Sequence, residues 1–311
     1  MASIEIGGRR IHYELRGPQS AMAVVFVNGL TQYSDLWIPY ASHFTEHGYR
    51  TLSYDMLGQG QSSKPVLGIE LDGHAALLER LLDALGIARA HVAGISFGGV
   101  VALRFAIAHP GRTASVAAMS TFSELTPQLK MLGAGLYQAL LQGGLPLLQN
   151  LLLALNFSSR WLGEHWEALP EMKRAGYVTN DLYALQNLME SFVRFEPFTG
   201  ELARVACPSL ILNGEYDCLT PRECHETLRR ALKNSRLVLL QHACHAFTLE
   251  VPAVTMRLLR EFVDSVENGG WTGDQSVWIA SDDPAAPVAL LPCTGDHLRA
   301  LPVPARDEVP A

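Results

Sequence analysis

The sequence predicts an α/β protein in which a mostly parallel central sheet is flanked by helices, with a helical cap inserted between two strands. Short apolar runs alternate with amphipathic helical patterns through the first 120 or so residues, which is typical of a parallel sheet covered by helices. Between residues 122 and 203 only helical patterns occur, and strand patterns then resume. An all-helical stretch between two strands indicates a cap over the sheet.

The individual elements follow this alternation. Residues 4–6 and 11–15 predict a hairpin that turns at Gly7-Gly8, and AVVFV at 23–27 is apolar throughout, as a strand buried on both faces should be. Residues 72–85 carry leucines at one-sided helical spacing. The other predicted elements are helices at 37–47, 100–109 and 252–266, strands at 49–54, 90–93, 114–120, 208–213 and 237–240, and a Gly-rich loop at 55–63.

Three segments are expected from this pattern. Residues 1–121 and 204–267 form the core, residues 122–203 form the cap, and residues 268–311 form a proline-rich carboxyl-terminal extension. Within the extension, residues 277–280 and 288–291 read as a hairpin, and we expect no chemical role for this tail.

Composition excludes several classes of function. The chain of 311 residues is 48% hydrophobic and has a formal charge of -7, and it lacks a basic block that could follow a phosphate backbone, so nucleic acid is not an expected partner. The amino terminus lacks a signal-peptide layout, which predicts a cytoplasmic protein. The apolar stretch at 143–157 is too short to span a bilayer and is interpreted as a buried or lid helix. Five cysteines without CxxC spacing fit a reducing compartment.

The segment Gly94-Ile-Ser-Phe-Gly98 matches the G-x-S-x-G motif where a predicted strand gives way to a helix. A Ser on so sharp a turn is lifted clear of the sheet, and the flanking glycines let the chain fold tightly. The adjacent helix amino terminus favours developing negative charge. Ser96 is therefore the candidate nucleophile.

A serine nucleophile needs a base and a group that orients the base. Of 11 histidines, His242 and His245 lie after the last strand of the predicted core, in a loop at the carboxyl edge of the sheet. We favour His245, at the end of that loop, and keep His242 as the alternative. Asp217 follows a strand and stands between Ser96 and His245 in chain order, as the orienting acid should. Glu215 and Glu124 are weaker candidates for the acid.

Four motifs together resemble the α/β-hydrolase superfamily, serine hydrolase branch, over residues 4–266: VNG at 27–29, DMLGQGQS at 55–62, GISFGG at 94–99, and the pair GEYDCLTP and HACHAF. The resemblance implies an oxyanion hole made by the backbone N-H groups of Leu30 and Phe97. Three departures from the family pattern stand out: Asn28 in place of the usual His, Leu57 in place of Arg, and His242-Ala-Cys244 before the candidate base. Asp55 is interpreted as a structural loop residue.

The cap supplies more apolar surface than its own packing requires, which predicts a pocket for a lipophilic acyl chain. We therefore predict a serine hydrolase that cleaves a carboxylic ester or thioester of a small lipophilic substrate through an acyl-Ser96 intermediate and needs no cofactor. The VNG and NGEYDCLTP motifs also resemble 3-hydroxyacyl-ACP acyltransferases, so transfer of an acyl chain from acyl carrier protein or CoA is the alternative. The apolar residues of the cap on which this rests are Leu125, Leu129, Met131, Leu132, Leu136, Tyr137, Leu140, Leu141, Leu145, Leu147, Leu148 and Leu151, Leu152 and Leu153.

Other functional classes fit the sequence less well. A metal site built from Cys218, His242, Cys244 and His245 is conceivable from residue type, but these residues coincide with the candidate catalytic loops, so no metal is predicted. A binding protein without chemistry would be expected to lack a triad member. Dehalogenase chemistry requires a carboxylate where Ser96 stands.

Overall fold

The structure is a computed structural model of the chain, and it describes residues 2–66, 69–283 and 291–293. In this part of the chain, ten strands form one sheet in the order β1-β2-β4-β3-β5-β6-β7-β8-β9-β10. The pairs from β4 through β9 are parallel, whereas β1, β2 and β10 join as antiparallel strands. The mostly parallel sheet that the sequence predicts is therefore confirmed.

The central strands are buried along their whole length. All five residues of β3 (Ala23–Val27) are buried, as are those of β4 (Arg50–Tyr54) and β5 (Ala90–Ile95). Gly7 and Gly8 both have positive φ, 59° and 72°, and form the predicted turn between the first two strands. The remaining strands are β1 (Ala2–Ile6), β2 (Arg9–Arg16), β6 (Thr113–Met119), β7 (Ser209–Gly214), β8 (Ser235–Leu240), β9 (Val277–Ala280) and β10 (Leu291–Cys293).

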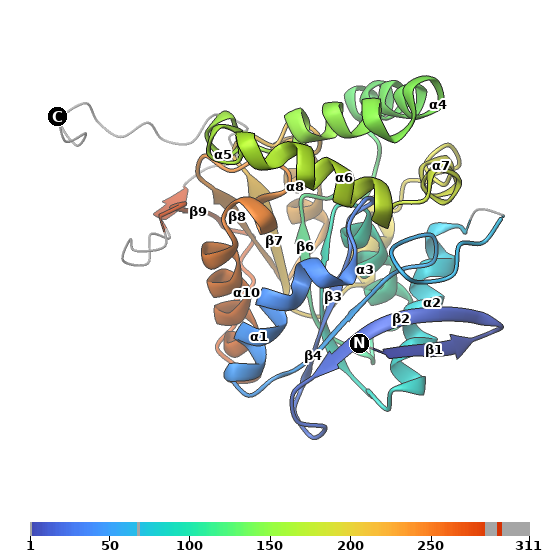
Figure 1. Ribbon diagram of the computed structural model, residues 1–311. Coiled ribbons are helices and arrows are strands. Elements are labelled where there is room, and N and C mark those ends of the chain that lie inside the picture. The colour runs from blue at the N-terminus through green and yellow to red at the C-terminus, as the bar shows by residue number, and fades with distance from the viewer. Residues whose placement is uncertain (1, 67–68, 284–290, 294–311) are drawn as a thin grey trace, which may run out of the picture.

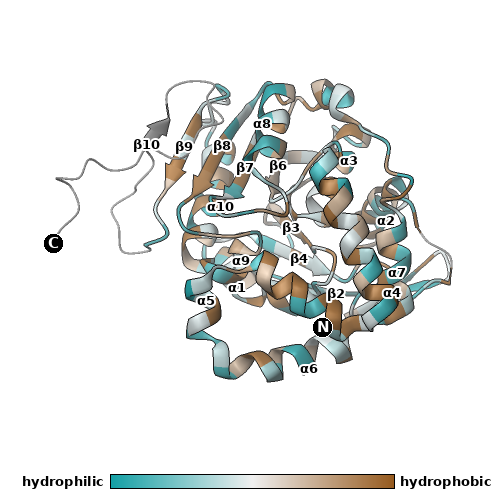
Figure 2. Cartoon of the chain, turned by 90° about the horizontal axis from the view of Figure 1, so that it is seen from above, coloured by the Kyte–Doolittle hydropathy of each residue, from teal (hydrophilic) through white to brown (hydrophobic). Residues whose placement is uncertain are grey.

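Helices cover both faces of the sheet (Figure 1). One hydrophobic cluster joins the sheet to α2 (Leu71–Ala84), α3 (Phe97–Ala108) and α8 (Arg222–Ala231). A second cluster, on the other face, joins it to α1 (Ile38–Glu46) and α10 (Pro252–Glu267). Figure 2 shows hydrophobic residues on the central strands and along α4. Short helical turns are η1 (Ser34–Trp37), η3 (Thr199–Arg204) and α9 (Phe247–Glu250).

The helical stretch between β6 and β7 lies above the carboxyl ends of the strands (Figure 1). It comprises α4 (Pro127–Asn156), α5 (Ser159–Glu164), η2 (Trp166–Ala168), α6 (Leu169–Thr179) and α7 (Leu182–Glu190). The long α4 is kinked at Gly144, whose φ is 61°, two residues before Pro146. Residues 143–157 are thus the second half of a kinked helix over the sheet edge, and no helix of the described residues is long and apolar enough to cross a membrane.

The carboxyl-terminal extension contributes two strands, β9 and β10, to the edge of the central sheet. Residues of β9 pair in parallel with β8, so the sheet continues past residue 267, the boundary expected for the core. β10 pairs antiparallel with β9, which gives the predicted hairpin with its second strand at Leu291–Cys293. Of the predicted second strand, residues 288–290 lie outside the described residues.

Candidate active site

Ser96 lies at the turn between β5 and α3. Its φ of 55° and ψ of -119° put a residue with a side chain in the left-handed half of backbone space, which is unfavourable unless the surroundings hold it. Its backbone N-H donates to the Met119 carbonyl of β6 at 2.8 Å, and its carbonyl accepts the Thr121 hydroxyl at 2.8 Å. These contacts fix the turn on the neighbouring strand, so the side chain is presented at the carboxyl edge of the sheet.

The two motif glycines are required by close backbone approaches. A Cβ at Gly94 would collide with the backbone of Gly98, and a Cβ at Gly98 would collide with the carbonyl groups of Val27 and Asn28. Because backbone cannot move aside as a flexible side chain can, both positions need glycine. Close packing within the turn therefore explains Gly94, and the packing of the turn against the end of β3 explains Gly98.

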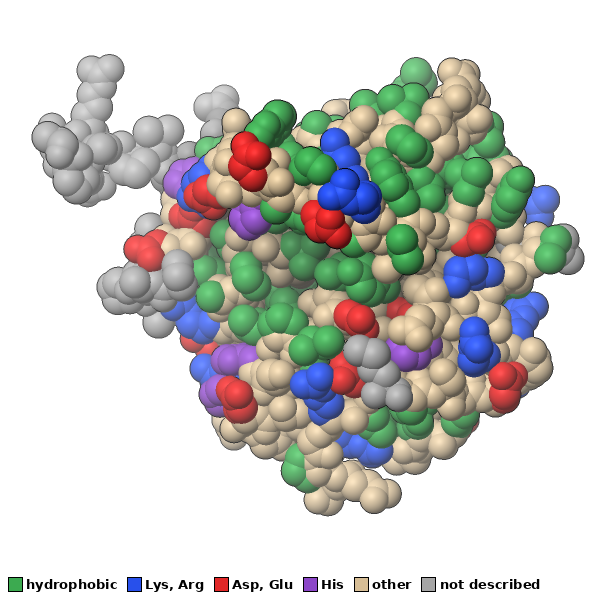
Figure 3. Space-filling model, in the orientation of Figure 1, with side chains coloured by type: hydrophobic (Ala, Val, Ile, Leu, Met, Phe, Trp, Pro, Cys, Tyr) green, Lys and Arg blue, Asp and Glu red, His purple; other side chains and the backbone are tan. Residues whose placement is uncertain are grey.

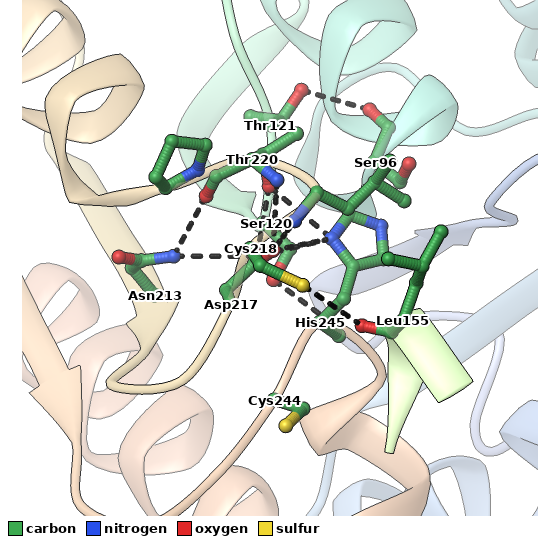
Figure 4. A network of polar contacts seen from close by, with 12 residues as sticks. Ser96, Ser120, Thr121, Leu155, Asn213, Asp217, Cys218, Thr220, Cys244 and His245 are labelled. Carbon is green, nitrogen blue, oxygen red and sulfur yellow. Dashed lines mark hydrogen bonds and ion pairs between the residues drawn. The ribbon is translucent and has the colours of Figure 1, made fainter. Parts of the chain in front are cut away.

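His245 and Asp217 are in direct contact. The Nδ1 atom of His245 lies 3.0 and 3.1 Å from the two carboxylate oxygens of Asp217, and both residues are buried. Figure 4 shows Ser96 beside the His245 ring, with Asp217 on the other side of the ring. Ser96 and His245 line the same cavity. The structure thus brings together, in one row, the three residues that the sequence singled out from three separate loops.

Hydrogen bonds orient the Asp217 carboxylate. The backbone N-H groups of Leu219 and Thr220 donate to Oδ1 at 3.0 and 2.8 Å, and the Thr220 hydroxyl donates to Oδ2 at 2.8 Å. Burial disfavours the charged carboxylate, but the adjacent His245 and the hydrogen bonds together hold the pKa of Asp217 below its ordinary value. Asp217 is therefore a buried anion aimed at His245 Nδ1.

The alternative base and acids lie elsewhere. The side chain of His242 is 52% exposed, and its Nδ1 faces Asp282 at 3.3 Å. Glu215 accepts the backbone N-H of His242 at 2.8 Å, and Glu124 accepts the Thr199 hydroxyl at 2.7 Å. None of these three residues lines the cavity that holds Ser96. The geometry favours His245 and Asp217 over them.

Leu30 and Phe97, the residues that the family resemblance assigns to the oxyanion hole, both line this cavity beside Ser96. Phe97 is the first residue of α3, and the first N-H groups of a helix have no partner within the helix. Asp55 is placed as predicted, in a structural role: its carboxylate accepts the backbone N-H groups of Ser34 and Gln61, each at 2.7 Å.

The cavity has a volume of about 500 Å³ and lies between the sheet edge and the helices above it. On the face drawn in Figure 3, hydrophobic side chains also gather in a hollow between these helices and the body of the protein. Most cavity-lining side chains are apolar, and none is a carboxylate. The apolar lining residues are Leu30, Ile95, Phe97, Phe122, Leu125, Leu129, Ala134, Leu136, Leu152, Met189, Phe192, Val193, Phe195, Leu219 and Ala246.

The apolar residues that the sequence assigned to the cap lie in three kinds of environment, which partly overlap. Leu125, Leu129, Leu136, Tyr137 and Leu152 line the cavity. Leu140 and Leu148 are buried in a hydrophobic cluster between α4 and α7, which also contains the cavity-lining Leu136. Others are exposed on the outer surface, among them Met131, Leu141, Leu147 and Leu151. The pocket therefore uses only part of the apolar surface on which the prediction rested.

Two polar residues of the site were not identified from the sequence. Besides bonding Asp217, the Thr220 hydroxyl lies 3.2 Å from His245 Nδ1. The Ser120 hydroxyl, from a residue with a φ of 41°, donates to the His245 carbonyl at 2.9 Å and anchors that loop. Thr220 stands three residues after the candidate acid and Ser120 directly after a strand, but only the fold reveals their partners. Among the described residues, no group of three or more His, Cys, Asp or Glu side chains could hold a metal ion.

The chain is similar to known proteins with the alpha/beta hydrolase fold. The sequence profile of the alpha/beta hydrolase fold family matches residues 22–252. A relative from Variovorax paradoxus, named "Putative carbamate hydrolase RutD", is 26% identical over 269 residues, covering 84% of this chain and 98% of the relative. The 3-oxoadipate enol-lactonase 1 of Acinetobacter baylyi is 24% identical over 272 residues, covering 84% of this chain and 95% of its own. The crystal structure of MGS-M2, an alpha/beta hydrolase enzyme from a Medee basin deep-sea metagenome library, superimposes with a TM-score of 0.76 at 25% identity, covering 85% of this chain and 97% of that chain.

The chain belongs to the alpha/beta hydrolase fold family. This membership confirms the family that the sequence motifs resembled, and with it the predicted enzyme class, an α/β hydrolase.

Proposed function

We propose that the protein hydrolyses carboxylic esters with a lipophilic acyl group through an acyl-Ser96 intermediate. The observation that carries the proposal is that Ser96, on a strained turn, shares an apolar cavity with His245, which is hydrogen-bonded to the buried Asp217. This is the arrangement by which a serine hydroxyl becomes a nucleophile.

In the first half of the reaction, His245 Nε2 accepts the Ser96 proton as Oγ attacks the ester carbonyl. Asp217 holds the Nδ1-H of His245 and stabilises the imidazolium that forms. The N-H groups of Phe97 and Leu30 donate to the oxyanion of the tetrahedral intermediate. The intermediate collapses when the bond to the leaving alcohol breaks and that alcohol takes the proton from His245, which leaves the acyl group on Ser96.

Water completes the cycle by the same steps in reverse. His245 removes a proton from the water as the water oxygen attacks the acyl-Ser96 carbonyl. When the second tetrahedral intermediate collapses, the bond from carbon to Ser96 Oγ breaks, His245 returns the proton to Oγ, and the carboxylic acid is released. Every bond that forms or breaks involves the substrate, water, Ser96 and His245, so the proposed reaction needs no cofactor.

The size and lining of the cavity support a lipophilic acyl group. Its volume of about 500 Å³ is typical of pockets for small molecules, and the leucine and phenylalanine side chains around Ser96 would be desolvated by an alkyl chain. A lactone is a cyclic ester, so the name of the Acinetobacter relative is in line with ester chemistry.

The test mixes enzyme, in amounts comparable to substrate, with p-nitrophenyl acetate, octanoate and decanoate and follows p-nitrophenol release, with Ser96→Ala as the control. We expect steady turnover that prefers the longer chains and is lost in Ser96→Ala. Equal rates on acetate and decanoate would refute the lipophilic pocket. A stoichiometric burst that stalls until a thiol or hydroxyacid acceptor is added would replace hydrolysis with acyl transfer.

A further inference from the structure

Two amide side chains are buried beneath the loop that follows β3. Asn28 is 0% exposed and Gln59, from the DMLGQGQS loop, is 1% exposed. The Nε2 atom of Gln59 donates to the carbonyl of Gly29 at 2.7 Å and to the carbonyl of Leu30 at 3.0 Å. One side chain thus holds two successive carbonyl groups of the candidate oxyanion loop.

The orientation of both amides follows from their partners. The Trp37 indole N-H can only donate, so the Asn28 atom that it meets at 2.8 Å is the oxygen. Asn28 Nδ2 then faces the Tyr54 carbonyl at 2.9 Å and the Gln59 side chain at 3.2 Å, and the Gln59 atom it meets must be the acceptor Oε1. Gln59 Nε2 is therefore the atom that donates to the loop carbonyls. The donors and acceptors of the hydrogen-bond chain Trp37–Asn28–Gln59 are thus consistent with one another.

This hydrogen-bond chain helps to orient the peptide that carries the Leu30 N-H, together with the Gln32 backbone N-H, which also donates to the Gly29 carbonyl, at 3.2 Å. In a trans peptide the C=O and N-H groups point in opposite directions, and none of the described peptide bonds is cis. The Gly29 carbonyl is bonded to Gln59, which does not line the cavity, whereas Gly29 and Leu30 both do. The Leu30 N-H is therefore directed away from Gln59. The preceding N-H, of Gly29, is already occupied by Gln32 Oε1 at 2.8 Å.

We propose that Gln59, oriented by Asn28, is a positioning residue that aims the Leu30 N-H at the oxyanion. This inference rests on the proposed function, because it assigns Leu30 a role in stabilising the intermediate on Ser96. Asn28 supplies the N-H that orients Gln59, while its side-chain oxygen accepts the Trp37 indole N-H.

The test compares Gln59→Leu and Gln59→Glu with a control, Gln61→Leu, whose side chain is exposed on the same loop. Rates on p-nitrophenyl decanoate are expressed per active site, titrated with a p-nitrophenyl alkylphosphonate that labels Ser96, so that misfolded protein does not count. Loss of one oxyanion donor costs about 10²–10³ in kcat, and we expect misdirection of one to lower kcat about 10- to 100-fold in Gln59→Leu. KM should stay within about two-fold, and Gln61→Leu should match the wild type.

Gln59→Glu supplies a signature that loss of packing would not produce. A charged carboxylate facing two carbonyl oxygens cannot donate, whereas its protonated form carries one O-H that can. We expect the activity of Gln59→Glu, divided by that of wild type at the same pH, to rise as pH falls. A flat ratio, or a kcat per site in Gln59→Leu within two-fold of wild type, would overturn the proposal. Absence of ester turnover in the wild type would refute the proposed function instead.

Discussion

Replacing Asp217 by Asn tests how the base is oriented, because it removes one charge while keeping the size of the side chain. The Leu219 and Thr220 N-H groups would hold the amide oxygen of the new side chain, since both donate to Oδ1 in the structure. Its NH2 group would then replace Oδ2, which now accepts from Thr220 Oγ1 at 2.8 Å and faces His245 Nδ1 at 3.0 Å. A donor facing Nδ1 favours the His245 tautomer that carries its proton on Nε2. In that tautomer Nε2 has no free lone pair and cannot accept the proton of Ser96.

The corresponding change in a serine protease triad lowers kcat about 10⁴-fold, which corresponds to about 5 kcal/mol of transition-state stabilisation. We expect a loss of about 10³- to 10⁴-fold in kcat for Asp217→Asn on p-nitrophenyl decanoate at pH 7.5. Thr220→Val, which removes the hydroxyl contacts to the carboxylate and to His245 Nδ1 but keeps the negative charge of Asp217, should lose far less. Circular dichroism and a thermal melt check that both variants are folded. A kcat for Asp217→Asn within ten-fold of wild type, in folded protein, would show that Asp217 does not orient the base.

Three further predictions follow from contacts in and around the site. His245→Ala should lose at least 10³-fold in kcat, whereas His242→Ala, which alters an exposed contact to Asp282, should stay within about two-fold on the same ester; the reverse result would make His242 the base. Gly98→Ala forces a methyl group onto the Val27 and Asn28 carbonyls and should lower the free energy of unfolding, measured in urea, by about 1–3 kcal/mol. Gly163→Ala, which places its methyl group in open space, should not lower it, and equal stabilities of the two variants would contradict the packing argument. His74 is fully buried, and burial lowers its pKa to about 4, so it favours folding above its unfolded pKa of about 6.5 and this contribution is lost as pH falls toward 4. By pH 5 the loss relative to pH 8 is about 2 kcal/mol, and His74→Leu should show a correspondingly smaller decline in urea melts; an unchanged decline would mean that His74 is not held neutral.

Much of the fold was predictable from local patterns. Three elements could be predicted from short stretches of sequence alone: the buried strand AVVFV, the helix with leucines on one side before residue 85, and the turn with glycines around Ser96. Ends of elements shifted by a few residues, as with α3, which begins at Phe97 and not at residue 100, because the helix starts directly at the strained turn. The sequence could not show that β9 joins the central sheet, since a four-residue strand gives no local sign of its partner.

The site was predictable where chain order carries information. Ser96, Asp217 and His245 each follow a strand, and parallel strands end at one edge of the sheet, so their proximity could be inferred. Asn28 and Gln59 were visible only as departures from a motif or as loop residues, because their roles depend on hydrogen bonds between segments about 30 residues apart. The same holds for Ser120, which meets His245 across 125 residues of sequence.

The central claim is that Ser96 carries the acyl group during turnover. The most direct measurement is rapid acid quenching of the enzyme with p-nitrophenyl decanoate, followed by mass spectrometry of the intact protein and of its peptides. The account predicts a decanoyl mass increment within milliseconds to seconds, located on Ser96 and absent from Ser96→Ala. Catalysis that persists in Ser96→Ala, or an increment on any other residue, would contradict it.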